Sequence, residues 1–222
     1  MEEKYEAFIV AKSFESVPLI SKTIANLRNK LTAPPEFRKQ LFQLGRYLAY
    51  EISKELPIET KIVESPLGKA EYLDVGNDLV ILGVLRAALP MAEGVFEEFP
   101  DARIGFLSAS RGTMIVEKGK DFEITTSYAK VPNCHSKTVL IIDPMLASGS
   151  TLLRIIDHLQ EQQPEKLIIV SAIGTDYGIK RIEEKNSDIQ IYIGIIDPVL
   201  NEIGYIIPGL GDAGDRAYNT EH

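Results

Sequence analysis

Short runs of consecutive apolar, mostly β-branched residues recur along this chain from residue 78 onward, separated by stretches with helical spacing. The apolar runs cover residues 78–85, 103–107, 138–142, 166–173 and 189–195, and the helical stretches are 90–98, 152–162 and 179–185. Strands that are apolar on both faces are typical of parallel sheets, which helices cover on both sides. Their alternation with helices predicts right-handed βαβ units, and therefore an α/β fold with a mostly parallel sheet flanked by helices.

Two stretches stand outside this alternation. Residues 34–56 begin with two prolines and carry apolar side chains every three or four positions, which predicts a long amphipathic helix starting at the prolines. Residues 108–132 are rich in Gly, Lys, Thr and Glu and lack helical spacing. A long excursion of this kind inside a compact α/β domain is typical of a lid or binding loop, so we expect a mobile lid there.

The composition bounds the class of protein. The chain has 222 residues, 45% hydrophobic and 25% charged, and a net charge of −8, which argues against nucleic acid as the main ligand. No apolar stretch has the length of a membrane span, and the acidic first residues do not resemble a signal peptide. The single cysteine, Cys134, excludes an internal disulfide, and with three histidines it makes a dedicated zinc site improbable. We therefore expect a cytoplasmic protein with no membrane or nucleic-acid partner.

No repeat and no Gly/Ser linker divides the chain. We expect a single domain over residues 1–222, with an N-terminal helical region at 1–57, the lid excursion at 108–132 and a distinct C-terminal segment at 197–222.

A buried strand at 138–142 runs into a carboxylate and then into a loop of small residues that opens a helix at 152. Ligands of parallel α/β sheets bind at the carboxyl ends of the strands. The loop offers backbone N–H groups and hydroxyls at a helix N-terminus, where the helix dipole favours an anion, so we predict a phosphate cradle with Asp143 placed beside it for ribose hydroxyls. The alternative is a plain turn with a Ser/Thr helix cap. The loop residues in question are Pro144, Met145, Leu146, Ala147, Ser148, Gly149, Ser150 and Thr151.

The C-terminal stretch 204–216 is rich in glycine and small residues around Pro208. Such a segment lets the main chain approach a planar ligand closely, and its alternating N–H and C=O groups can read the ligand's edge. The alternative is a bland structural loop.

The run Asp-Pro-Met-Leu-Ala-Ser-Gly-Ser-Thr at 143–151 closely resembles the phosphoribosyl pyrophosphate (PRPP) loop of uracil phosphoribosyltransferases, in which proline follows the aspartate. Segment 204–216 resembles the base-binding segment of the same family almost residue for residue, and similarity extends over most of the chain from about Ile20. One departure is the pair Gly149-Ser150, where the family usually has two glycines. A Cβ at position 150 could crowd the phosphate or demand a slightly different loop.

Two arginines complete the resemblance. Arg86 lies in Leu-Arg-Ala-Ala-Leu at 85–89, which resembles the family's pyrophosphate loop with Ala88 in place of glycine, and Arg111 falls at its second PRPP-contacting arginine. Around Arg111 the match is weakest. The family has tyrosine before that arginine and an acidic pair after it, whereas this chain has Ser110 and then Gly-Thr.

The resemblance implies a type I phosphoribosyltransferase-like fold with a flexible lid and a small C-terminal base-binding hood. It implies conversion of uracil and PRPP to UMP and diphosphate in pyrimidine salvage, by positioning and electrostatics and without a covalent nucleophile. PRPP would be bound by Arg86, Arg111, Asp143, the loop residues 144–151 and Asp212. Uracil would be bound by Ile206, Gly211, Asp212 and Ala213, and the catalytic residues would be Asp212, Arg86 and Asp143.

Mg²⁺ is the implied cofactor, and PRPP and water would hold it without a dedicated ligand cluster. A homodimer or higher homo-oligomer is the implied assembly. Three alternatives remain open: a phosphoribosyltransferase for a different base, a regulatory nucleotide-sensing homologue, and a flavodoxin-like or Rossmann binding module. The last lacks a Gly-x-Gly-x-x-Gly fingerprint and leaves the C-terminal segment unexplained.

Overall fold

The computed structural model describes residues 11–76, 78–111 and 124–220. Its centre is one sheet with the strand order β1–β10–β9–β7–β4–β5–β6, in which every neighbouring pair is parallel except β5 and β6. The strands are β1 (Ala11–Ser13), β4 (Leu79–Leu85), β5 (Arg103–Arg111), β6 (Ile124–Lys130), β7 (Thr138–Ile142), β9 (Lys166–Thr175) and β10 (Gln190–Asp197), and the short β8 (Met145–Leu146) pairs with β9.

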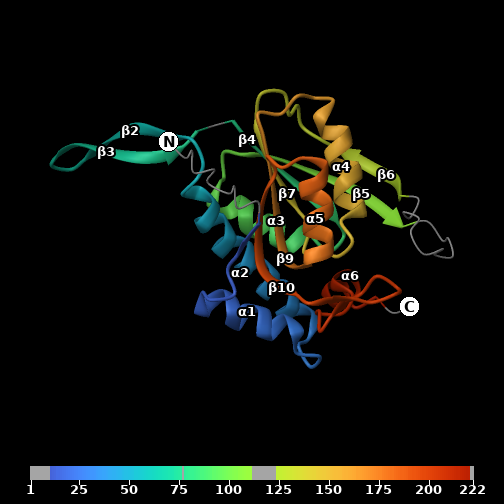
Figure 1. The fold of residues 1–222 in the computed structure, drawn as a ribbon. Coiled ribbons are helices and arrows are strands. Elements are labelled where there is room, and N and C mark those ends of the chain that lie inside the picture. Colours follow the sequence, from blue (N-terminus) through green and yellow to red (C-terminus); the bar gives the residue numbers. More distant parts are fainter. Residues whose placement is uncertain (1–10, 77, 112–123, 221–222) are drawn as a thin grey trace, which may run out of the picture.

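Helices cover both faces of this sheet (Figure 1). Helices α1 (Pro18–Arg28), α2 (Pro34–Ser53) and α3 (Leu89–Glu98) lie on one side, and α4 (Ser150–Gln160) and α5 (Asp176–Lys185) on the other. The strands β4 and β7 are almost wholly buried, as their continuous apolar runs require. The expected α/β fold, with a mostly parallel sheet flanked by helices, is therefore confirmed.

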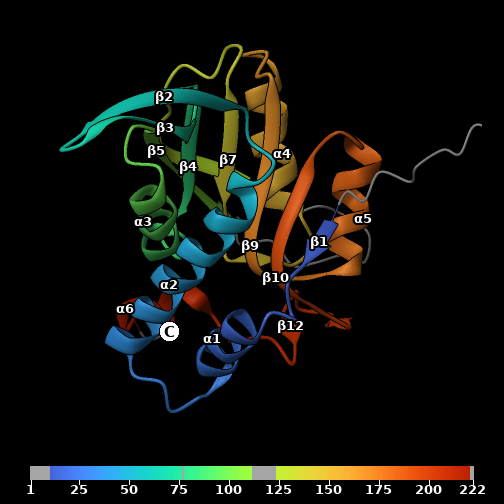
Figure 2. The ribbon, with the colours of Figure 1, turned by 90° about the vertical axis from the view of Figure 1, so that its left-hand side faces the viewer.

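The carboxyl ends of the parallel strands meet the C-terminal segment. There β11 (Val199–Leu200) and β12 (Ile206–Ile207) form a small antiparallel pair, and α6 (Ala213–Tyr218) follows. Figure 2 shows β12, α6 and α1 gathered at this end of the sheet. The segment that resembles a base-binding hood thus lies at the edge where α/β sheets bind their ligands.

Two features were not anticipated from the sequence. An antiparallel hairpin of β2 (Ile58–Ser65) and β3 (Gly68–Val75) projects from the opposite end of the molecule (Figures 1 and 2). The excursion at 108–132 is also more regular than expected, because its two ends form the antiparallel pair β5 and β6. Residues 112–123, on which the lid prediction mainly falls, lie outside the described residues, so that prediction stays open.

Within the described ranges, none of the helices combines the length and the apolar character needed to cross a lipid bilayer.

Candidate active site

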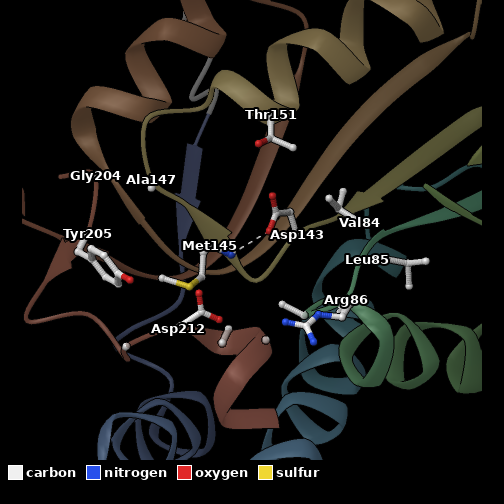
Figure 3. A pocket seen from close by; sticks show the side chains of 14 residues that line it. Val84, Leu85, Arg86, Asp143, Met145, Ala147, Thr151, Gly204, Tyr205 and Asp212 are labelled. Atoms are coloured by element: carbon white, nitrogen blue, oxygen red, sulfur yellow. Dashed lines mark hydrogen bonds between the residues drawn. The ribbon is translucent and has the colours of Figure 1, made fainter. Parts of the chain in front are cut away.

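A cleft of about 420 Å³ opens at the carboxyl end of the sheet. It is bordered by the end of β4, by the loop after β7 and by the start of α6, three segments that are far apart in the sequence. Figure 3 shows Thr151 and Asp143 on one side of this space and Asp212 and Arg86 on the other. The lining residues are Val84, Leu85, Arg86, Ala87, Asp143, Met145, Ala147, Thr151, Gly204, Tyr205, Gly211, Asp212, Ala213 and Gly214.

The loop after β7 is shaped by backbone contacts. The N–H of Asp143 donates to the carbonyl of Val170 at 3.1 Å, which continues the sheet, and the Asp143 carboxylate accepts from the N–H of Met145 at 3.2 Å. Gly149, with φ of 76°, is the N-cap of α4, and as a glycine it has no side chain to cap the helix. The Ser148 hydroxyl accepts from the N–H of Ser150, the first residue of α4, at 3.4 Å, so the alternative of a turn with a Ser/Thr cap stays open.

Arg86 and the C-terminal helix meet across the cleft. The Arg86 guanidinium donates to the Asp215 carboxylate at 3.3 Å and to the Thr220 hydroxyl at 3.5 Å, while its side chain remains 57% exposed. Asp212 is the N-cap of α6, and its carboxylate accepts from the N–H of Asp215 at 2.9 Å. The cleft thus brings together a half-exposed cation and the carboxylates of Asp143 and Asp212.

A buried ion pair fixes the C-terminal segment to the rest of the fold. Asp197, at the end of β10, is 2% exposed and accepts from both terminal nitrogens of Arg28, at 2.5 and 3.0 Å. The same carboxylate accepts from the N–H of Gly209 at 2.9 Å, and Arg28 also donates to the Gly209 carbonyl at 3.3 Å. Gly209 is therefore held through both its backbone polar groups.

Arg216 ties α6 to the N-terminal helices. Its guanidinium donates to the carbonyls of Leu210 at 2.7 Å, Asn29 at 2.6 Å and Leu27, and it lies over the Phe37 ring at 4.4 Å. Burial lowers the pKa of this guanidinium. Arg216 therefore connects α6 to the end of α1 and to the loop before α6, because a guanidinium can donate to several carbonyls at once.

The structure brings most of the residues predicted for the site to one cleft. Arg86, Asp143, Met145, Ala147, Thr151, Gly211, Asp212 and Ala213 line it. The other members of the loop and Ile206 are not among its lining residues within the described chain; Leu146 and Ile206 are buried. Arg111 ends β5, and its side chain lies outside the description.

Sequence reasoning missed several lining residues. Gly204 and Tyr205 line the cleft, and they could have been predicted because they belong to the segment 204–216 that resembles the family's base-binding segment. Ala87 also lines the cleft, and its place directly after Arg86 was the signal for it. Arg216 closes the same segment 204–216, but its sequence position gave no indication that its guanidinium would contact the N-terminal helices. Arg28 gave no indication of its contact with Asp197, because an arginine at the end of a helix is usually a solvated charge.

The residues present suit a divalent cation that is held mainly by a substrate. Two carboxylates, those of Asp143 and Asp212, line the cleft. No group of three or more His, Cys, Asp or Glu side chains suited to a metal occurs in the described residues. A hard cation with several waters and substrate oxygens in its shell needs no more than one or two protein carboxylates.

Comparison with known proteins links this chain to one family. The family model for uracil phosphoribosyltransferase matches residues 14–220. Proteins named uracil phosphoribosyltransferase from Thermococcus kodakarensis and Methanococcus maripaludis are 43% and 41% identical to the chain, over 93% and 95% of it and over 89% and 90% of their own lengths. Among solved structures, the AQ2163 protein from Aquifex aeolicus matches with a TM-score of 0.86 at 36% identity, covering 95% of this chain and 99% of that one.

Proposed function

Because the chain belongs to the uracil phosphoribosyltransferase family, we propose that its cleft joins uracil to the ribose 5-phosphate of PRPP, forming UMP and diphosphate in pyrimidine salvage. One observation carries the proposal. The two segments that carry the family's most specific motifs, at 143–151 and 204–216, border the same cleft although they are distant in the chain. A transferase must hold its donor and its acceptor side by side, and two binding segments that border one cleft would meet this requirement.

The loop at 147–151 is proposed to bind the 5-phosphate. It leads into α4, whose N-cap is a glycine without a side chain, and an anion at that position would be stabilised by the N–H groups of the first turn and by the helix dipole. Asp143, beside the loop, is proposed to accept hydrogen bonds from the ribose hydroxyls. Pro144 and Leu146 would hold the loop backbone in place rather than contact the substrate with their side chains. Leu146 is buried, and the Pro144 carbonyl accepts from the N–H groups of Ala172 and Ile173.

Arg86 is proposed to bind the diphosphate. Its guanidinium makes long contacts with Asp215 at 3.3 Å and with Thr220 at 3.5 Å and is 57% exposed, so it can exchange these partners for a phosphate oxygen. Arg111, at the end of β5, is proposed as a second cation for the same group, and residues 108–132 as the lid over it. The projecting pair β5 and β6 supports an arm-like excursion at this place.

Uracil is proposed to bind along residues 206–213. Uracil offers an acceptor–donor–acceptor edge, which alternating backbone N–H and C=O groups can match, whereas cytosine would leave buried groups unpaired. Gly211, Asp212 and Ala213 line the cleft, while the Ile206 side chain is buried and would contribute through its backbone. Tyr205, which also lines the cleft, is a further candidate wall for the base.

The reaction is a displacement at the anomeric carbon, in which the diphosphate leaves as a uracil nitrogen attacks. The chain's own residues would fix the sugar through Asp143 and the phosphate loop, and offset charge on the departing diphosphate through Arg86. Asp212, exposed at the start of α6, would polarise the base side of the site or hold a water of the metal. Mg²⁺, when bound to PRPP, would neutralise the diphosphate, and Asp143 and Asp212 are the carboxylates placed to hold its waters.

A homodimer or higher homo-oligomer and a cytoplasmic location complete the proposal. The β2–β3 hairpin supports an assembly, because a lone two-stranded hairpin is marginally stable in water and this one exposes a row of large apolar side chains. They are Ile58, Ile62, Val63, Leu67, Tyr72 and Leu73. A second copy of the chain that covers the hairpin would bury them.

The test is PRPP-dependent conversion of labelled uracil, with cytosine, thymine, orotate and hypoxanthine in parallel. We expect turnover with uracil alone. The variant Asp143→Asn should lower kcat/KM for PRPP at least about tenfold through a lost charge-assisted hydrogen bond, with little change in melting temperature. Asp188→Asn, an exposed carboxylate before β10 at the opposite edge of the sheet, is the control. Equal turnover of another base, or losses in Asp143→Asn that merely follow its stability, would contradict the proposal.

A further inference from the structure

Ser150 stands where the family usually has the second of two glycines, and its side chain contacts Arg181 on the neighbouring helix α5. Ser150 is buried, at 9% exposed, and its hydroxyl accepts from a guanidinium nitrogen of Arg181 at 2.9 Å. The same nitrogen donates to the carbonyl of Ser148 at 2.8 Å. The side chain at position 150 is thus engaged from α5, and it is not among the residues that line the cleft.

We propose that Arg181 is a positioning residue for the phosphate loop, acting through Ser150 and the backbone of Ser148. The inference rests on the proposed function, in which this loop binds the 5-phosphate of PRPP. Arg181 itself does not line the cleft, so its effect on the substrate is indirect.

The first step of the argument concerns the peptide planes of the loop. The carbonyl of Ala147 accepts from the Thr175 hydroxyl at 2.8 Å, and the carbonyl of Ser148 accepts from Arg181. Two successive carbonyls therefore face α5 and the residue that caps it. In a trans peptide the N–H points opposite to the C=O, so the N–H groups of Ser148 and Gly149 face away from α5. Ala147 and Thr151, which flank these N–H groups in the chain, both line the cleft.

The second step concerns the direction of the hydroxyl donors. A guanidinium can only donate, so Ser150 Oγ accepts from Arg181 and can pass its own hydrogen to Ser148 Oγ, 3.1 Å away. Ser148 Oγ also accepts from the N–H of Ser150 at 3.4 Å. A hydroxyl oxygen can accept two hydrogen bonds, so the contact between Ser148 and Ser150 can run in either direction. When Ser150 is the donor, the Ser148 hydrogen can be donated to a phosphate oxygen, and Arg181 holds the Ser150 end of this hydroxyl pair in place.

The third step is electrostatic. The guanidinium lies one hydrogen bond from the loop and is stacked near the Tyr177 ring, at 5.7 Å from its centroid, which restrains it. A fixed positive charge behind the loop favours an anion in front of it without occupying the cleft.

The experiment compares Arg181→Met, Arg181→Lys, Ser150→Ala and the double variant Arg181→Met/Ser150→Ala, with Lys180→Met as the matched control. Lys180 is the preceding residue on the same helix, is exposed and carries the same charge. Steady-state kinetics give KM for PRPP and for uracil separately, calorimetric titration gives PRPP binding, and thermal melting reports folding.

We expect Arg181→Met to weaken PRPP binding and raise its KM about tenfold, as the loss of one charge-assisted hydrogen bond implies, and to change KM for uracil less than about twofold. Arg181→Lys, which keeps a donor and the charge, should recover part of the loss. Ser150→Ala should weaken PRPP binding by a smaller factor, and the double variant should be no worse than Arg181→Met, because both changes remove the contact between Arg181 and Ser150.

An Arg181→Met enzyme with wild-type KM for PRPP would overturn the inference, as would additive effects in the double variant or an equal loss in Lys180→Met. If Arg181→Met does not fold, Arg181→Lys and Ser150→Ala replace it in the test. Each should raise KM for PRPP more than KM for uracil. A wild-type protein that does not bind PRPP would overturn the proposed function, and this inference with it, whereas normal wild-type binding with insensitive variants would overturn the inference alone.

Discussion

Removing the Asp197 carboxylate should destabilise the fold and loosen the C-terminal segment 204–216, which is proposed to bind uracil. Asp197→Ala takes away the partner of both Arg28 nitrogens and the acceptor of the Gly209 N–H. Loss of one member of a buried ion pair costs roughly 3–5 kcal/mol. Arg28 keeps 21% side-chain exposure and can be partly rehydrated, so we expect the lower end, about 3 kcal/mol. In a domain of this size that corresponds to a fall in melting temperature of about 6–12 °C.

The kinetic consequence should fall on uracil. Gly209 lies two residues before the lining residue Gly211, so its release should raise KM for uracil several-fold more than KM for PRPP. Asp197→Asn keeps an acceptor for the Gly209 N–H but loses the charge, and it should be intermediate in stability and closer to wild type in KM for uracil.

Differential scanning calorimetry and steady-state kinetics measure the two effects. The matched control is Glu98→Ala, which removes the carboxylate of the exposed Arg46–Glu98 pair, whose side chains are 43% and 35% exposed. Such a pair contributes about 0–1 kcal/mol, so the control should melt within a few degrees of wild type. Equal melting temperatures for Asp197→Ala and Glu98→Ala, or an unchanged KM for uracil in Asp197→Ala, would refute the reasoning.

Two further predictions concern single sites. Gly211→Val should abolish most uracil turnover at saturating PRPP, because φ at this position is 76° and a Cβ would lie 3.3 Å from Arg216 Cδ; near-normal turnover would contradict this. Cys134 is buried, and burial raises the pKa of its thiol, so iodoacetamide at pH 8 should label the folded protein at least about tenfold more slowly than the unfolded chain. Similar labelling rates, followed by mass spectrometry, would show that the thiol is accessible.

The features predicted correctly are those whose signal is local in the sequence. Strand β7 has the bounds that its apolar run predicts, and the long helix after the two prolines begins where they require. The residues of the loop after β7 are likewise contiguous in the sequence, and Asp143, Met145, Ala147 and Thr151 line the cleft. The β2–β3 hairpin gave no such signal, because exposed apolar and polar residues occur on both of its strands and its sequence has no buried face to reveal.

The scaffold of the site could not be predicted because its contacts are remote in the chain. Arg28 and Asp197 are 169 residues apart, Arg216 and Leu27 are 189 apart, and even Arg181 and Ser150 are 31 apart. Each arginine lies in a helix, where an arginine side chain is usually a solvated charge. Only the packing of α1, α5 and α6 around the loops decides otherwise.

These contacts bear on how an acidic chain can be expected to hold a polyanionic substrate. Arg28, Arg181 and Arg216 lie near the site, yet none of them lines the cleft, and each donates to backbone carbonyls or to a buried carboxylate. Their charge is used to fix loops, which leaves Arg86 as the arginine that lines the cleft within the described residues. Under the proposed function, recognition of the phosphates would then come largely from N–H groups held in place before the substrate arrives, a form of electrostatic stabilisation that needs no net positive surface. It follows that substitutions which loosen the loops from behind should impair this site as much as substitutions that change its lining.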